Sequence, residues 1–166
     1  MNLQTEPLSI GDSNYAIHKH WMSRAVELAQ AAGDAGEVPV GAVIVEGTGK
    51  LIAAAQNRRE RDCDPTAHAE VLVLRAAGKV LQDWHLNQCT LYVTLEPCPM
   101  CAGAIVQARI GLLVYGADDP KTGTIRTVAN LPDSPASCHR LRVLGGIMES
   151  VCRDQLLCWF EARRQS

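Results

Sequence analysis

Apolar residues recur with the 3.6-residue spacing of helices in some segments and form short, β-branched runs in others. Helical spacing predicts helices over residues 21–32, 68–77 and 99–108 and from about Met148 onward. Short apolar runs predict strands over residues 38–45, 51–55, 91–95 and 112–115. We expect Gly33 and Gly78 to end the first two helices and Thr66 to cap the second.

The order of these segments predicts an α/β fold. Gly47, Thr48 and Gly49 separate the first two strands, which are therefore expected to form a β-hairpin. A helix joins the third strand to the fourth, and a crossover of this kind pairs its two strands in parallel. The result is a mixed central sheet with helices on its faces. Residues 57–65 are predicted to form a charged loop and residues 118–137 an irregular stretch.

The length of 166 residues fits one domain. Residues 1–17 contain scattered Pro, Gly, Asp and Asn and are predicted to form a flexible arm, so that residues 18–166 make up the single domain. The content of 47% hydrophobic and 20% charged residues excludes a disordered or fibrous chain. Internal repeats and linkers are not evident.

Composition and charge narrow the class of protein further. The chain has no run of about 18 apolar residues, which a membrane-spanning helix needs. Its first 13 residues are polar and acidic and do not resemble a secretory signal, so we expect a soluble, cytoplasmic protein. The net charge of −2 is not that of a general nucleic-acid binder, and any contact with RNA must depend on a local patch.

Seven cysteines, an odd number at irregular spacing, do not indicate a disulfide framework. Cys98 and Cys101 stand apart, because Pro99 between them is well placed to begin a helix that turns both sulfurs the same way. His68 in the stretch Pro65–Glu70 adds an imidazole. Thiolate and imidazole are the ligands that Zn²⁺ prefers, so the sequence predicts a zinc site.

The number of ligands indicates a catalytic zinc site. Three protein ligands leave a fourth position for water, whose pKa the metal lowers toward ~7, whereas a structural site closes with four. Glu70 is then the candidate general acid and base. Because residues two apart share no face in the middle of a helix, His68 and Glu70 can converge only near a helix end. We therefore expect the metal to lie at the N-terminus of the helix that carries His68 and Glu70, with the N-terminus of the helix of Cys98 and Cys101 as a second one beside it.

Several alternatives remain for these residues. The pair of cysteines is also compatible with a thioredoxin-like redox motif, although the His-Ala-Glu stretch would then be a coincidence. A fourth side chain would make the zinc structural, and the further candidate ligands are Cys63, His85 and His139. The remaining buried thiols, as we interpret them, are core residues: Cys89, Cys152 and Cys158.

The pairing of His-Ala-Glu with Pro-Cys-x-x-Cys resembles the signature of zinc-dependent nucleobase deaminases. In more detail, the chain resembles the bacterial tRNA-specific adenosine deaminase family, and the resemblance runs from about Trp21 to Arg164. The stretches that carry it are Val38–Val43, Asn57, Asp64–Glu70, Leu91–Ala104 and Lys121–Gly123.

The resemblance implies a three-layer α/β/α fold of the cytidine deaminase type, a homodimer and one Zn²⁺ per subunit. It implies hydrolytic deamination of adenosine to inosine at the wobble position of a tRNA anticodon stem-loop. His68, Cys98 and Cys101 match the zinc ligands, and Glu70 matches the proton shuttle. The residues that match substrate-binding positions are Asn57, Asp119, Val40, Ala69 and His139.

Two departures from the family pattern lie downstream. Many members have Ser-Leu-Met where this chain reads Thr127-Val128-Ala129, and Asn-His where it reads Cys138-His139. A flipped anticodon base requires groups that stack on or bind its neighbours. The basic candidates for RNA contact are Lys121, His139, Arg140, Arg142, Arg153, Arg163 and Arg164.

Two other functions are compatible with the same residues. One is a deaminase of a free base or nucleoside, such as guanine or cytosine, on the same scaffold. The other is a non-enzymatic RNA-binding module whose zinc is structural. Ammonia release from each substrate separates the first from a tRNA deaminase, and substitution of Glu70 tests the second.

Overall fold

The computed structural model describes residues 12–166, in which five strands form one mixed sheet in the order β2-β1-β3-β4-β5. The strands are β1 (Gly41–Glu46), β2 (Leu51–Gln56), β3 (Cys89–Leu95), β4 (Leu112–Ala117) and β5 (Arg142–Leu144). β1 pairs antiparallel with both β2 and β3, while β3, β4 and β5 are parallel. The predicted hairpin and the predicted parallel crossover are both confirmed.

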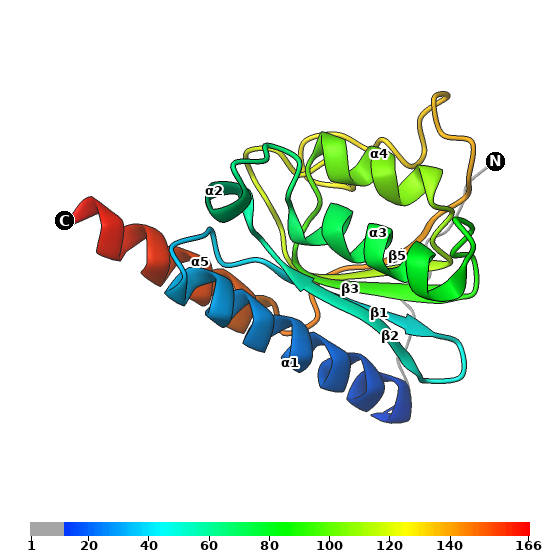
Figure 1. Ribbon diagram of the computed structural model, residues 1–166, viewed down its shortest axis with the longest axis horizontal. Helices are drawn as coiled ribbons and strands as arrows, with labels where there is room; N and C mark the ends of the chain where they lie inside the picture. Colours follow the sequence, from blue (N-terminus) through cyan, green and yellow to red (C-terminus); the bar gives the residue numbers. More distant parts are fainter. Residues whose placement is uncertain (1–11) are drawn as a thin grey trace.

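Helices cover both faces of the sheet and give three layers, seen edge-on in Figure 1. They are α1 (Asp12–Asp34), α2 (Arg59–Asp62), α3 (Ala69–Leu81), α4 (Pro99–Gln107) and α5 (Glu149–Arg164). α3 and α4 lie on one face, and α1 and α5 lie on the other. The predicted three-layer α/β/α fold is confirmed.

Alternation of side chains along β1 explains the two layers of core. Ala42 and Ile44 are fully buried in the core cluster that includes α3 and α4. Val43 and Val45, one residue out of phase, are buried in the cluster that includes α1 and α5. Because successive strand residues point to opposite faces, a continuously apolar strand requires a helix layer on each side.

Gly41 allows α1 to approach the sheet closely. A Cβ atom at this position would lie 2.1 Å from the Ala25 carbonyl oxygen and 2.6 Å from the Ala29 backbone nitrogen. Ala25 and Ala29 are themselves fully buried small residues on the facing side of α1. The helix backbone therefore packs directly on the start of β1, and no other residue type fits there without a shift.

Strand directions bring separate parts of the chain together at one end of the sheet. β3, β4 and β5 are parallel, and all three end at this end of the sheet, which we call the carboxyl end. β1 begins at this end and β2 finishes at it, because each is antiparallel to its neighbour. The residues next to these strand ends are Val40, Asn57, Glu96 and Asp118.

Some of the predicted boundaries are wrong. Residues 12–17 belong to α1 and not to the predicted arm, while residues 1–11 lie outside the described residues. Thr66 does not cap α3: the N-cap is His68, and the Thr66 hydroxyl binds Asp64 instead. Gly78 lies inside α3, which continues to Leu81 and ends with Gln82 in the left-handed conformation. α1 ends one residue after Gly33.

Two short elements were not predicted from the sequence. The single turn α2 occupies part of the loop 57–65, and β5 is a three-residue edge strand after the irregular stretch 118–137. Elements this short carry no detectable hydrophobic period. Cys89 and Cys152 are buried as expected, but Cys158 is exposed, contrary to the prediction.

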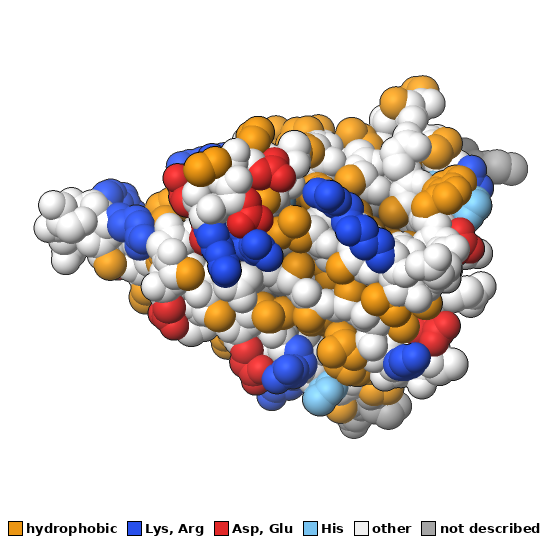
Figure 2. Space-filling model, in the orientation of Figure 1, with side chains coloured by type: hydrophobic (Ala, Val, Ile, Leu, Met, Phe, Trp, Pro, Cys, Tyr) orange, Lys and Arg blue, Asp and Glu red, His pale blue; other side chains and the backbone are white. Residues whose placement is uncertain are grey.

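Apolar side chains also reach the surface over α3 and α4, where Figure 2 shows them interrupted by basic groups. Three large apolar side chains are exposed here: Val80 in the last turn of α3 (59%), Trp84 in the following loop (58%) and Met100 at the start of α4 (36%). None of the described helices has the length and hydropathy needed to cross a membrane.

Candidate active site

Three ligand-bearing side chains converge from two helix N-termini. His68 is the N-cap of α3, Cys98 is the N-cap of α4, and Pro99 as the first helical residue carries Cys101 one turn further. His68 Nδ1 lies 3.7 Å from Cys98 Sγ and 3.4 Å from Cys101 Sγ. Tetrahedral zinc bound at ~2.0 Å to nitrogen and ~2.3 Å to sulfur separates such atoms by about 3.6 Å. The geometry therefore fits zinc.

The electrostatics of the group favour thiolate. A hydrogen bond from Cys101, with a further contribution from His68, lowers the pKa of the Cys98 thiol to about 4. The same interaction between the sulfurs, together with burial, raises the pKa of Cys101. The hydrogen bond to Cys98 raises the pKa of His68. Both N-caps also lie at the positive end of a helix dipole, which stabilises negative charge.

Glu70 lies in the first turn of α3, beside this group, and is only 4% exposed. Burial raises the pKa of its carboxyl to about 7, against smaller opposing effects that include the charge of His68. A carboxyl group that titrates near neutrality can both accept and release a proton at working pH. The expected convergence of His68 and Glu70 at a helix end is confirmed.

Asn57 connects the ends of β2, β1 and α3. Its side-chain oxygen accepts the Ala69 N–H at 2.9 Å, and its Nδ2 donates to the Val38 carbonyl at 3.1 Å. Its own backbone N–H donates to the Val40 carbonyl at 3.1 Å. The three residues predicted to contact substrate from this side, Asn57, Val40 and Ala69, are thus buried neighbours at the carboxyl end.

Asp119 also lies at the carboxyl end, in the loop after β4. Its Oδ1 accepts the N–H groups of Lys121 and Thr122 at 2.9 and 3.2 Å, which shapes a tight turn. His139 is not brought to this group. It precedes β5, and its Nε2 lies 2.7 Å from the Ile110 carbonyl oxygen before β4, at the opposite end of the sheet.

The other candidate ligands do not join the metal group. Cys63 is exposed, and its sulfur lies 3.7 Å from the Glu60 carbonyl. The ring of His85 pairs with Asp83 at 2.8 Å. Among residues 12–166, the one group of three potential ligands that lies within metal-binding distance is His68, Cys98 and Cys101. All seven cysteines are free, so the disulfide of a redox motif is not formed.

Two buried carboxylates near the site were not identified from the sequence. Glu37 is 3% exposed and accepts the backbone N–H groups of Glu60 and Arg61 at 3.2 and 2.8 Å, so that it holds the turn α2. Glu96, 1% exposed, accepts hydrogen bonds from the loop after β4. The one available signal was an acidic residue beside an apolar strand or motif, which does not separate a buried carboxylate from an exposed one.

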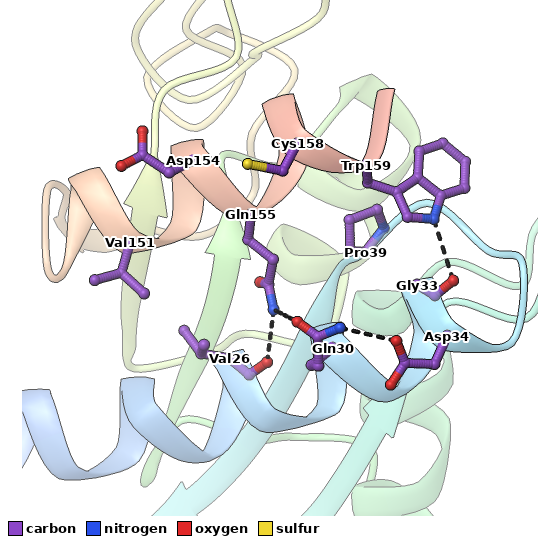
Figure 3. Close-up of a pocket in the computed structure, with 10 residues that line it drawn as sticks. All are labelled: Val26, Gln30, Gly33, Asp34, Pro39, Val151, Asp154, Gln155, Cys158 and Trp159. Atoms are coloured by element: carbon purple, nitrogen blue, oxygen red, sulfur yellow. Dashed lines mark hydrogen bonds between the residues drawn. The ribbon is translucent and has the colours of Figure 1, made fainter. Parts of the chain in front are cut away.

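A groove of about 540 Å³ lies between α1 and α5, on the other face of the sheet (Figure 3). Gln155 donates from Nε2 to the Val26 carbonyl at 3.2 Å and to Gln30 Oε1 at 3.3 Å. Trp159 donates from Nε1 to the Gly33 carbonyl at 3.2 Å. These contacts join the two helices, and none of the predicted site residues lines the groove.

Comparison with known proteins gives a consistent picture. Residues 16–153 match the family described as MafB19-like deaminase. The chain is 45% identical over 145 residues to the tRNA-specific adenosine deaminase of Bacillus subtilis (strain 168), covering 87% of this chain and 89% of that protein.

Solved structures show the same fold. One from a study of A-to-I editing by tRNA:A34 deaminases at the wobble position of transfer RNA has a TM-score of 0.80 at 44% identity, and covers 82% of this chain and 99% of its own. A guanine deaminase from Bacillus subtilis has a TM-score of 0.60 at 36% identity, and covers 90% and 94% of the two chains.

Proposed function

The chain belongs to the tRNA-specific adenosine deaminases, within the cytidine deaminase-like family, and from this premise we propose that it converts the wobble adenosine of tRNA anticodons to inosine. The reaction replaces the exocyclic amine by oxygen from water and releases ammonia. The observation that carries the proposal is the convergence of His68, Cys98 and Cys101 beside the buried carboxyl of Glu70. The reaction is a hydrolysis, so water is the only co-substrate.

His68, Cys98 and Cys101 would hold one zinc ion per subunit. Their spacing fits tetrahedral coordination, and the lowered pKa of Cys98 supplies a thiolate. When bound, zinc supplies the Lewis acidity that makes water a nucleophile near neutral pH. Three protein ligands, and not four, are available in the group, as a catalytic site requires.

Glu70 acts in this proposal as the proton shuttle. With a pKa raised to about 7, its carboxyl takes one proton from the attacking water and delivers it to the ring nitrogen. It then moves the second proton, that of the newly formed hydroxyl group, to the departing amine. Asn57 orients the nucleoside, because its amide keeps one N–H that neither Val38 nor Ala69 uses. Val40 and Ala69 form the apolar wall beside it.

The RNA is proposed to approach the carboxyl end of the sheet. Lys121 is exposed in the turn that Asp119 shapes there. The last turns of α5 extend past the sheet on the side where α2 lies (Figure 1), and they carry Arg163 and Arg164. Arg163 stacks on Trp159 with its guanidinium carbon 3.5 Å from the ring centroid, which leaves a flat, cationic surface suited to bases and phosphates.

A second copy of the chain is proposed to cover the surface of α3 and α4. A groove of about 770 Å³ lies between these helices, and its apolar lining includes Val71, Leu74, Leu86 and Trp84. The exposed apolar side chains Val80, Trp84 and Met100 lie on the same face, and an exposed apolar patch commonly marks a protein interface. This surface adjoins the helices that carry Glu70 and Cys101, so that a dimer would also stiffen the site.

Ammonia release separates the proposed function from its alternative. The zinc-loaded protein is incubated with a tRNA carrying adenosine at the wobble position, with free adenosine, with guanine and with cytosine. The proposal predicts release from the tRNA and none above background from the free compounds. The 36% identity to a guanine deaminase makes guanine the strictest comparison, and release from guanine alone would support the free-base function instead.

A further inference from the structure

Glu96 is a buried carboxylate that the metal group and the proton shuttle do not use. It directly follows β3 and precedes Cys98 by two residues, and 1% of it is exposed. Its backbone N–H donates to the Ala117 carbonyl at 2.8 Å, which extends the pairing of β3 with β4. None of the ion pairs among residues 12–166 involves it. A buried charge of this kind must be stabilised by hydrogen bonds.

One loop supplies all of these hydrogen bonds: residues 118–131, which we name the clamp loop. Oε1 accepts three consecutive backbone N–H groups, those of Ile125, Arg126 and Thr127 at 3.2, 2.7 and 3.0 Å. Oε2 accepts the Asp119 N–H at 3.0 Å and the Thr127 hydroxyl. Consecutive N–H groups directed at one oxygen form the backbone concavity that binds anions. The carboxylate of Glu96 therefore occupies the place of a bound anion in this concavity.

The clamp loop closes tightly around the carboxylate. A Cβ atom on Gly123 would lie 2.3 Å from Glu96 Oε2 and 2.6 Å from the Asp119 carbonyl oxygen, so that only glycine fits. The Thr124 N–H donates to the Pro97 carbonyl at 3.0 Å. The loop is thus bonded both to the carboxylate and to the peptide that leads into Cys98.

The hydroxyl of Thr127 is part of the hydrogen-bonding shell of the carboxylate. The structure gives that hydroxyl a partner, Glu96 Oε2, and so accounts for a serine or threonine here. The neighbouring Val128 side chain is 59% exposed, so this position does not require a particular residue type.

We propose that Glu96 is a positioning residue for RNA: it holds the clamp loop so that Asp119 and Lys121 face the RNA beside the target adenosine. This inference rests on the proposed function. A loop that is already ordered does not have to lose conformational freedom when RNA binds, so its order favours binding. Glutamine at this position would offer one acceptor oxygen and direct an NH₂ group at N–H donors of the loop.

The test compares Glu96→Gln with Glu46→Gln as the matched control. Glu46 lies at the other end of β1, where its carboxylate accepts only the exposed Thr48 hydroxyl. Three quantities are measured on the zinc-loaded proteins: hydrogen exchange of the amides of Ile125–Thr127, zinc content, and the KM and kcat for an anticodon stem-loop RNA. Thr127→Val, which removes one donor, gives the same test at smaller amplitude if Glu96→Gln does not fold.

For Glu96→Gln we expect exchange in the clamp loop to accelerate about tenfold or more. Zinc content should be unchanged, KM should rise about tenfold, and kcat should stay within about threefold, because ordering of the loop is then required at binding. Glu46→Gln should change none of these quantities. A general loss of fold would instead accelerate exchange of amides throughout the chain, and not in the clamp loop alone.

Unchanged hydrogen exchange at Ile125–Thr127 in Glu96→Gln would contradict the claim that Glu96 orders the clamp loop, whichever substrate the enzyme uses. Faster exchange with an unchanged KM, or a fall in kcat together with zinc loss, would overturn the role in RNA positioning and indicate action through Cys98. A wild-type protein that deaminates no RNA contradicts the proposed function itself and removes the RNA part of the inference. The exchange measurement then still decides whether Glu96 orders the loop.

Discussion

At the scale of single residues, burial assigns different tasks to chemically similar groups. Glu70 and Glu96 are both buried carboxyls within reach of the metal group's helices. Glu96 is surrounded by donors, and although burial alone would raise its pKa, these hydrogen bonds lower the pKa below its ordinary value, so it stays ionised. In Glu70 burial dominates and raises the pKa to about 7. One carboxylate organises backbone, and the other is suited to move protons.

Glu70→Gln tests the proton shuttle. Because the amide is nearly isosteric but cannot take up a proton at neutral pH, we expect kcat to fall by at least ~100-fold while the fold and zinc content are retained. The measurement is ammonia release from tRNA together with metal analysis of the purified variant. Turnover equal to that of the wild type would exclude Glu70 from the mechanism.

Cys101→Ser tests the ligand set. The hydroxyl is a poor replacement for a thiolate ligand, so we expect the variant to bind less than one zinc per chain and to unfold at a lower temperature than the zinc-loaded wild type. Cys63→Ser is the control, since Cys63 is exposed and outside the metal group. Full zinc occupancy in Cys101→Ser, or zinc loss in Cys63→Ser, would contradict the assignment.

At the scale of elements, the sequence predicted the grouping of His68, Cys98 and Cys101 better than it predicted the boundaries of helices and strands. The motifs His-x-Glu and Cys-x-x-Cys set local geometry, because spacing at a helix N-terminus largely determines where side chains point. Asn57 was found through the resemblance, and its bonds to Ala69 and Val38 explain why an amide is needed there.

What the sequence did not predict depends on tertiary packing. β5 is three residues long and exists only because β4 offers a paired edge. Gln82 adopts the left-handed conformation that Gly78 was expected to supply, since α3 gains another turn of packing first. His139 was assigned by resemblance, but its ring binds Ile110 at the other end of the sheet.

Gly41→Ala tests the close packing of α1 on β1. A methyl group at this position meets backbone atoms of Ala25 and Ala29, which cannot rotate away, so we expect a loss of about 1–3 kcal/mol in the free energy of unfolding. The control is Gly103→Ala in α4, where a Cβ atom meets nothing within 4 Å. Urea denaturation of both variants measures the difference. Equal stability of Gly41→Ala and wild type would show that α1 is less closely packed.

At the scale of the whole molecule, each face of the sheet carries a pair of helices with a groove between them and exposed apolar side chains. α1 and α5 contact each other, and Gln155 and Trp159 join them by hydrogen bonds. The outer surface of α3 and α4 carries exposed apolar side chains, with a groove between the helices. The proposed dimer would bury this surface and leave the carboxyl end of the sheet accessible to RNA.

Trp84→Glu tests the dimer. The side chain is 58% exposed in the single chain, so a charge there should not disturb the fold, but it would be costly within an apolar interface. We expect sedimentation to report two chains for the wild type and one for the variant at micromolar concentration. Tyr15→Glu, at a 43% exposed position on α1, is the control and should remain dimeric. A monomeric wild type, or a dimeric Trp84→Glu, would contradict the proposed interface.

The central claim is that one zinc-binding group and one buried carboxyl act on a single nucleotide of tRNA. It is tested most directly by sequencing tRNA after incubation with the zinc-loaded wild type and with Glu70→Gln. The account predicts inosine at the anticodon wobble position with the wild type, and unchanged adenosine with the variant. Wobble adenosine left intact by the wild type, or inosine spread over other positions of the tRNA, would contradict it.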